Sequence, residues 1–167
     1  TQSMVSVTVD GSAVEIPEGS SILDATRKAS ADVPTICKSD RLEAIGACRM
    51  CLVEVEGWRK PVASCHTPVS EGMNIQTTTP LIERVRHNIQ ELIHYSKHNR
   101  HDFEVDDSHP FIRLDMNHCI HCFRCVDVCN EIQGSFVLGM AGRGIDNHVV
   151  AGLSLIHISE PTRRLNI

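Results

Sequence analysis

Eight cysteines are the residues of this sequence best suited to do chemistry, and they form two groups of four. The first group has the spacing Cys-x10-Cys-x2-Cys-x13-Cys, and the second has Cys-x2-Cys-x2-Cys-x3-Cys. Thiolates this close together chelate metals readily, whereas Cys-x2-Cys pairs are poorly spaced for structural disulfides. The groups are Cys37, Cys48, Cys51 and Cys65, and then Cys119, Cys122, Cys125 and Cys129. We therefore expect two metal sites.

The spacing of the first group suits a [2Fe–2S] cluster. Such a cluster needs four thiolates converging from a loop whose backbone N–H groups turn toward the sulfurs. We expect the small residues Gly46 and Ala47 to let the chain approach the cluster closely. The first interval is longer than the four residues of plant-type ferredoxins. A zinc site and buried unliganded thiols are the alternatives for this group.

The second group has the spacing of bacterial [4Fe–4S] ferredoxins. We expect its first three thiolates to bind three corners of one cluster from a tight turn, and Cys129 to open a helix. In two-cluster ferredoxins that fourth cysteine serves the other cluster and precedes a proline, whereas Asn130 follows here. We interpret the neighbouring His118 and His121 as exposed loop residues and not as ligands.

The elements that position the first group are predicted from periodicity. Residues 4–9 alternate as a strand, Asp10-Gly11 is a hairpin signal, and residues 13–16 return. Ser20 or Ser21 then caps a short helix that ends near residue 30, and further strands are expected at 51–56 and 73–77. Strands crossed by one helix describe a small mixed sheet of the β-grasp type.

A longer helix is predicted next, with Thr79 as its N-cap and Pro80 in its first position. Apolar residues recur at helical spacing over 81–93, which predicts a face packed on the preceding sheet. The polar stretch 98–109 is interpreted as a linker and 111–115 as a strand. The fold class is therefore α+β. We expect a β-grasp domain at 1–79, a helical connector at 80–109 and a partial [4Fe–4S] unit at 110–152.

Composition narrows the function further. The 167 residues carry a formal net charge of −5, which argues against nucleic acid as a partner, and no apolar run is long enough to span a bilayer. The first twelve residues lack the apolar core of a signal peptide, so we expect a cytoplasmic protein with reduced thiols. No Ser/His/Asp arrangement or paired carboxylate set stands out, so no catalytic site is expected in this chain.

Several runs of residues resemble a known superfamily. Residues 46–56 (GACRMCLVEVE), 61–65 (PVASC) and 67–69 (TPV) resemble the N-terminal [2Fe–2S] domain shared by three enzymes. These are the large iron–sulfur subunit of respiratory complex I, iron-only hydrogenases, and the alpha subunit of NAD-dependent formate dehydrogenases. Residues 107–113 (DSHPFIR) and 129–134 (CNEIQG), with 136–150, look like the formate dehydrogenase branch. The resemblance assigns the first four cysteines to the [2Fe–2S] cluster.

The resemblance implies an electron-transfer segment that relays electrons one at a time. The complete protein would be a molybdopterin-dependent formate dehydrogenase, with a molybdopterin domain outside this chain and a flavin- and NAD-linked subunit as electron partner. An iron-only hydrogenase or complex I subunit is the first alternative. A zinc-stabilised binding module without a redox role, and a stand-alone ferredoxin-like carrier, are the others.

The sequence also departs from that family. The family's intermediate cluster motif, His-x3-Cys-x2-Cys-x5-Cys, is absent; His94 or His98 is interpreted as a remnant of its histidine, and no cluster is expected there. The second Cys-x2-Cys-x2-Cys-x3-Cys motif is also absent, so we expect an incomplete [4Fe–4S] site, with Cys129 meant for a second cluster. Residues 153–167 do not continue the family pattern. We interpret them as a non-native tail on a fragment truncated at both ends.

Overall fold

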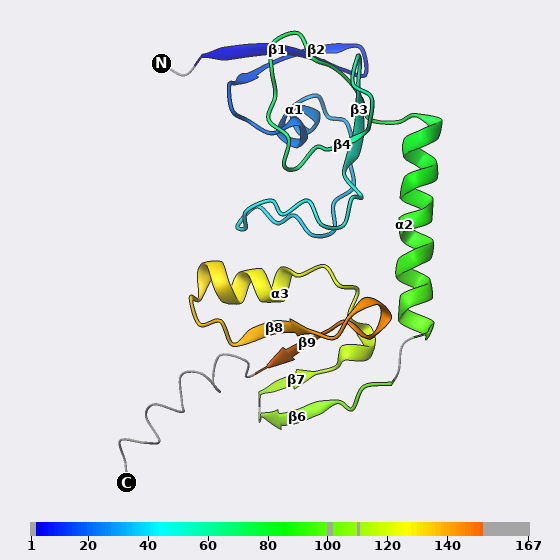
Figure 1. The fold of residues 1–167 in the computed structure, drawn as a ribbon. Helices are drawn as coiled ribbons and strands as arrows, with labels where there is room; N and C mark the ends of the chain where they lie inside the picture. The colour runs from blue at the N-terminus through cyan, green and yellow to red at the C-terminus, as the bar shows by residue number, and fades with distance from the viewer. Residues whose placement is uncertain (1–2, 100–101, 110, 152–167) are drawn as a thin grey trace. The chain divides into compact units, whose positions relative to one another are not determined.

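The computed structural model describes residues 3–99, 102–109 and 111–151, which Figure 1 shows in colour. The chain divides into two compact units, Thr1–Glu91 and Leu92–Ile167, and each is described by itself below. The tail expected at 153–167 lies outside the described residues, and so does the side chain of His98.

The first unit is built on a five-stranded sheet with the order β2-β1-β5-β3-β4. Strands β1 and β5 are parallel, and the other neighbours are antiparallel. The four strands predicted from the sequence are confirmed, whereas β4 has only two residues and is too short to show an alternating pattern. The strands are β1 (Met4–Val9), β2 (Ser12–Pro17), β3 (Leu52–Val55), β4 (Val62–Ala63) and β5 (Asn74–Gln76).

Local sequence accounts for the first hairpin and the first helix. Asp10 and Gly11 both have positive φ, as two-residue hairpin turns favour. Helix α1 (Ile22–Lys28) has Ser21 as its N-cap, one of the two residues, Ser20 and Ser21, that the sequence predicts for this position. The Ser21 hydroxyl accepts a hydrogen bond from the Asp24 N–H at 3.2 Å, and the Ser21 N–H donates to the Asp24 carboxylate at 3.1 Å. This reciprocal capping box satisfies two backbone donors at the helix start.

The core of this unit lies between α1 and the sheet, as Figure 1 shows. Strand β1 buries alternate residues, Val5, Val7 and Val9, on one face. Ile22 and Leu23 of α1 are 0% and 1% exposed within the same cluster. Burying such side chains stabilises the unit by about 1.5–3 kcal/mol each.

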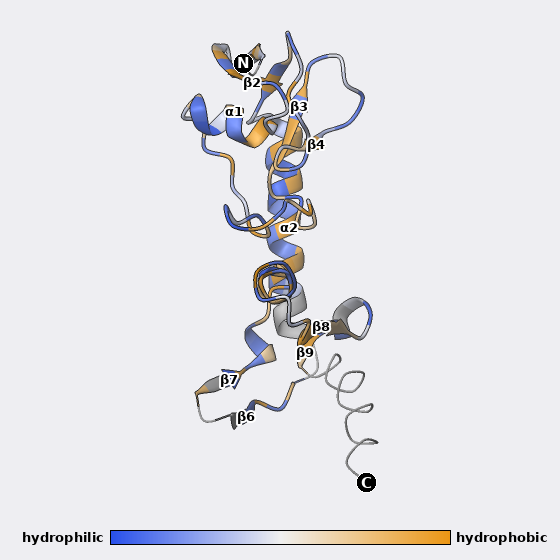
Figure 2. Ribbon diagram, turned by 90° about the vertical axis from the view of Figure 1, so that its left-hand side faces the viewer, coloured by the Kyte–Doolittle hydropathy of each residue, from blue (hydrophilic) through white to orange (hydrophobic). Residues whose placement is uncertain are grey.

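The long helix α2 (Pro80–Asn99) begins where predicted, and the Ile82 N–H donates to the Thr79 hydroxyl at 3.2 Å. The predicted packing face is confirmed in part: Ile82 is 0% exposed and the apolar residues at 85, 89 and 93 are half-buried, but Leu81 and Leu92 are 43% and 66% exposed. Figure 2 shows hydrophobic and hydrophilic residues interleaved along the helix. A helix of 20 residues is about 30 Å long, whereas the four-residue strand β3 spans only about 13 Å. The sheet is therefore too small to cover the whole apolar stripe.

The second unit contains two separate two-stranded sheets, β6–β7 and β8–β9. The strand predicted at 111–115 is confirmed as β7, but the linker predicted at 98–109 is wrong in its last four residues, which form β6. Asp106 and Asp107 of β6 are exposed, so the strand has no apolar alternation by which to recognise it. The elements are β6 (Asp106–His109), β7 (Ile112–Leu114), a 3₁₀ turn η1 (Met116–His118), α3 (Arg124–Asp127), a π-helical turn η2 (Val128–Ile132), β8 (Leu138–Ala141) and β9 (His148–Ala151), with a 3₁₀ turn η3 (Gly144–Asp146) between the last two strands.

The hairpin of β8 and β9 depends on a glycine. Gly142 has a φ of +81°, and a Cβ built on it would lie 2.3 Å from the Asp146 carbonyl oxygen. Both the conformation and the close approach therefore require glycine at this position. The core of this unit is small, with Val126, Cys129 and Val149 buried.

Candidate metal centres

Cys51 and Cys65 are brought together by the pairing of β3 with β4. Leu52 lies opposite Ala63, and the Ser64 N–H donates to the Cys51 carbonyl at 3.1 Å. Cys51 directly precedes β3 and Cys65 follows β4, so their side chains meet; both are buried, at 1% and 4% exposure. The Cys65 thiol donates to the Cys51 sulfur, which lowers the pKa of Cys51 to about 6 and raises the pKa of Cys65.

Cys37 and Cys48 form a second pair, within the loop that connects α1 to β3. Burial is the main cause that raises the pKa of the Cys37 thiol. Burial also opposes ionisation of Cys48, but backbone hydrogen bonds from Cys37, Met50 and Ile36, together with the Cys37 thiol, outweigh it and lower the pKa of Cys48. Backbone N–H groups therefore face these sulfurs, as we expect for a loop that binds a cluster.

The two pairs lie in one neighbourhood, because the charges of Cys37 and Cys48 both act on Cys65. Among the described residues, no group of three or more His, Cys, Asp or Glu side chains is placed to hold a single metal ion. The buried Ser64 hydroxyl has no well-formed hydrogen bond to any described residue, yet it is near enough to the Cys51 sulfur to lower its pKa. Two thiol pairs with polar groups facing them match the four-thiolate ligand set of a [2Fe–2S] cluster.

Hydrogen bonds fix the chain on both sides of Cys65. The first amides of α1 donate to the loop after β4: the Ile22 N–H to the Thr67 carbonyl at 2.8 Å, and the Leu23 N–H to the Ser64 carbonyl at 2.9 Å. The His66 ring lies 3.0 Å from the Ala44 carbonyl oxygen and so connects this segment to the loop that carries Cys48.

Gly46 adopts a left-handed backbone conformation, with a φ of +61°, which favours glycine. A Cβ there would meet Ala63 at 3.7 Å, an ordinary contact, so the neighbouring protein atoms do not themselves require glycine. Arg49, one residue after Cys48, adopts the same region with a φ of +60°.

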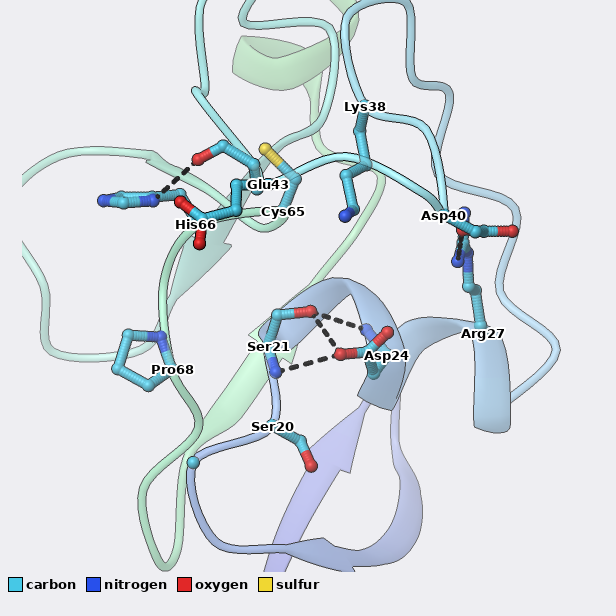
Figure 3. Close-up of a pocket in the computed structure, with 12 residues that line it drawn as sticks. Ser20, Ser21, Asp24, Arg27, Lys38, Asp40, Glu43, Cys65, His66 and Pro68 are labelled. Carbon is cyan, nitrogen blue, oxygen red and sulfur yellow. Dashed lines mark hydrogen bonds and ion pairs between the residues drawn. The ribbon is translucent and has the colours of Figure 1, made fainter. Parts of the chain in front are cut away.

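A pocket of about 610 Å³ opens beside Cys65, between the start of α1 and the loops at 38–44 and 65–68 (Figure 3). Its lining carries both signs of charge, with Arg27 paired to Asp40 at 2.8 Å. The neighbouring Arg27 guanidinium holds the pKa of Asp40 below its usual range. Cys65 is among the residues that line this polar pocket.

The second group places three of its cysteines together. Cys119 ends η1, Cys122 lies in a turn where His121 and Phe123 have positive φ, and Cys125 lies in α3. The pKa of Cys125 is raised, mainly because its sulfur is partly shielded from water and also because the charges of Cys119 and Cys122 act on it. The His121 N–H donates to the Cys119 sulfur at 3.5 Å.

Cys129 makes different contacts. Its sulfur lies 3.1 Å from the Ser135 hydroxyl and accepts a hydrogen bond from the Leu138 N–H at 3.5 Å, and Ser135 is the main cause that lowers its pKa. The prediction that Cys129 opens a helix is wrong, because the helix begins at Arg124 and Cys129 lies in the π-helical turn that follows. The left-handed residue Phe123 allows the chain to enter the helix one residue before Cys125.

The two histidines beside these cysteines differ in exposure. His118 is exposed and lies 3.7 Å from the Asp115 carboxylate, whereas His121 is half-buried. Sequence reasoning missed Asn117, whose side-chain amide bonds both the N–H and the C=O of Phe103 at 2.9 and 3.0 Å. It also missed Ser64 and Arg86, both beside Cys51. Of these two residues, only Ser64 had a sequence signal, which was its position next to Cys65.

All eight cysteines are free thiols in this structure. In the part of the chain that the structure describes, no helix combines the length and the apolarity needed to cross a membrane.

Comparison with known proteins agrees with these sites. Residues 2–80 match the family of 2Fe-2S iron–sulfur cluster binding domains. Residues 109–156 match the ferredoxin-like domain of NADH-quinone oxidoreductase subunit 3. The two matched segments contain the first and the second cysteine group, respectively. The fold and the thiol sites thus define an iron–sulfur protein of the electron-transfer class.

Individual relatives show which members of this class the chain is similar to. The chain is 35% identical to the NADH-ubiquinone oxidoreductase 75 kDa subunit of Reclinomonas americana, over 94% of this chain and 27% of the relative. It is 36% identical to the mitochondrial NADH-ubiquinone oxidoreductase 78 kDa subunit of Neurospora crassa, over 85% of this chain and 23% of the relative. A crystal structure of an NAD⁺-reducing [NiFe]-hydrogenase aligns with a TM-score of 0.77 and 25% identity, covering 88% of this chain and 74% of that chain.

The chain is thus similar to the iron–sulfur region of the 75 kDa-type subunits of NADH-quinone oxidoreductases and to a subunit of an NAD⁺-reducing hydrogenase. It spans about a quarter of the length of these oxidoreductase subunits.

Proposed function

We propose that Cys37, Cys48, Cys51 and Cys65 hold a [2Fe–2S] cluster and that the chain passes single electrons through it. The observation that carries this proposal is the arrangement of the four thiols as two adjacent pairs, 37 with 48 and 51 with 65. Each pair supplies two thiolates, which is what each iron of such a cluster requires. When bound, the group supplies one-electron chemistry.

The residues around the pairs have the properties that such a role needs. Burial of Cys37, Cys51 and Cys65 excludes water from their sulfurs, and backbone N–H groups offset the charge of the thiolates. The lowered pKa of Cys51 favours the deprotonated form that binds iron. These features support iron–sulfur ligation over buried inert thiols.

For the second group we propose that Cys119, Cys122 and Cys125 bind three corners of a [4Fe–4S] cluster. Their placement around one left-handed turn supports this assignment. Cys129, with its contacts to Ser135 and Leu138, is proposed as a ligand toward a second cluster.

We propose that the parent enzyme is an NAD-linked oxidoreductase in which this segment connects a catalytic domain to a flavin- and NAD-linked subunit in the cytoplasm. The relatives favour an NADH-quinone oxidoreductase or NAD-reducing hydrogenase. The runs at 107–113 and 129–134 favour the formate dehydrogenase alpha subunit, which would add a molybdopterin domain. Assays of the parent enzyme with NADH, hydrogen and formate as electron donors distinguish these parents.

The test is metal and sulfide analysis of the chain purified without oxygen. We expect iron and acid-labile sulfide with visible charge-transfer bands. Cys51→Ser should lower both contents, and Cys122→Ser should lower them independently by the share of the second site. Stoichiometric zinc in colourless protein would instead support the binding module and overturn the proposal.

A further inference from the structure

Arg86 of α2 contacts the backbone on both sides of Cys51. Its Nε donates to the Met50 carbonyl at 3.2 Å, and its Nη2 donates to the Leu52 carbonyl at 3.0 Å. These two carbonyls belong to the residues directly before and after the cysteine. One guanidinium therefore spans the short segment that presents the Cys51 sulfur.

Attaching the helix does not account for these contacts. Ile82, one turn earlier on the same face of α2, is already completely buried. The guanidinium of Arg86 is partly desolvated, which lowers its pKa, while the charges of Cys51, Asp32 and Glu83 favour its ionised form. A partly buried cation is costly unless its donors find acceptors, and here the two carbonyls accept hydrogen bonds from Nε and Nη2.

The position of this charge matters for a redox group. Reduction adds one negative charge to an iron–sulfur cluster, and a nearby fixed positive charge stabilises that added charge. Arginine stays protonated throughout the accessible pH range, so its contribution is permanent. Charge and hydrogen bonding around the sulfurs are among the features that set cluster potentials.

We propose that Arg86 is a positioning residue for the [2Fe–2S] site: it fixes the segment 50–52 around Cys51 and raises the reduction potential of the cluster. This inference rests on the proposed ligation by Cys51. Removing the guanidinium should therefore make reduction less favourable and release iron faster.

The experiment compares three variants of the 167-residue chain loaded with iron and sulfide under anaerobic conditions. Arg86→Met removes the charge and both donors but keeps an apolar side chain. Arg86→Lys keeps the charge, but its ammonium lacks the planar fork that reaches two carbonyls. Arg84→Met is the matched control, since Arg84 is exposed and lies two residues away, on another face of the helix. The readouts are the reduction potential of the [2Fe–2S] signal and the rate of iron loss to a chelator.

For Arg86→Met we expect the reduction equilibrium to fall about tenfold, which is about 59 mV for one electron, with faster iron loss. For Arg86→Lys we expect a potential near that of the wild type with faster iron loss. Arg84→Met should behave as the wild type does.

Three results overturn the inference. The first is a loaded Arg86→Met protein whose potential is unchanged, and the second is an equal shift of the potential in Arg84→Met. The third decides the case in which Arg86→Met does not load: an Arg86→Lys protein that retains iron as long as the wild type does. If the wild type itself assembles no [2Fe–2S] cluster, the proposed function fails, and the inference about Arg86 fails with it.

Discussion

Three neighbouring residues act on Cys51 or on the backbone beside it. The Cys65 thiol donates to it, the Ser64 hydroxyl lies beside it, and Arg86 spans the carbonyls on either side of it. Because these groups come from two segments that are distant from Cys51 in the sequence, the environment of Cys51 depends on the folded sheet. Cys48 depends more on its own loop: burial alone would raise its pKa, but backbone hydrogen bonds from residues 36, 37 and 50, together with the Cys37 thiol, lower it.

At the same scale, Gly142 offers a prediction about the second unit. Gly142→Ala should destabilise the protein by about 2–3 kcal/mol, because the new Cβ meets the Asp146 carbonyl and the φ of +81° is strained for alanine. Gly144→Ala is the control: its φ is +58° but the space around it is open, so only about 1 kcal/mol is expected. Urea unfolding of the anaerobically purified protein measures both. Equal losses would show that the contact with Asp146 is not limiting.

Among the elements, α1 and the β3–β4 pair position the thiols. The amide groups at the start of α1 hold the loop after β4, and the short β3–β4 ladder brings Cys51 beside Cys65. The helix α2 adds Arg86 on the other side of the same segment. The proposed [2Fe–2S] site therefore depends on the sheet and both helices, although its ligands look like a loop motif in the sequence.

The attachment of α2 gives a prediction at this scale. Ile82→Ala should cost about 2–5 kcal/mol, because it leaves a cavity where the helix meets the core. Leu92→Ala, at a position that is 66% exposed, should change stability by no more than about 0.5 kcal/mol. Thermal unfolding of the two variants provides the comparison. A large loss in Leu92→Ala together with a small one in Ile82→Ala would mean that the helix is held by a different face.

Elements with strong local signals could be predicted, and the others could not. Neighbouring residues alone were enough to predict three features: the alternation of β1, the Asp10-Gly11 turn and the Thr79-Pro80 start of α2. The two-residue strand β4 and the polar strand β6 have no periodicity of their own, because pairing with β3 and β7 creates them. The apolar stripe of α2 predicted a helix correctly, but it did not predict how little of that helix the sheet covers.

In the candidate sites, too, features that depend on neighbouring residues could be predicted, whereas features that depend on residues distant in the sequence could not. Cysteine spacing was enough to separate two groups and to set Cys129 apart from the other three of its group. The pairing of Cys37 with Cys48 and of Cys51 with Cys65 follows from loop and strand register, which the spacing does not contain. Ser64 and Arg86 lie beside Cys51 only in the folded chain, so the sequence contained no sign of Arg86 and marked Ser64 only by its position next to Cys65.

For the whole molecule, the two units each carry one cysteine group, and each is matched by its own iron–sulfur domain family. Ligand loss in one unit should therefore leave the other group intact, because no cysteine of one group belongs to the loop that carries the other.

Electron paramagnetic resonance of the dithionite-reduced, anaerobically reconstituted chain tests the central claim most directly. We predict a signal from a reduced [2Fe–2S] cluster that is present in the parent, lost in Cys48→Ser and retained in Cys122→Ser. The absence of any such signal in the parent, or a Cys48→Ser spectrum identical to that of the parent, would contradict the account.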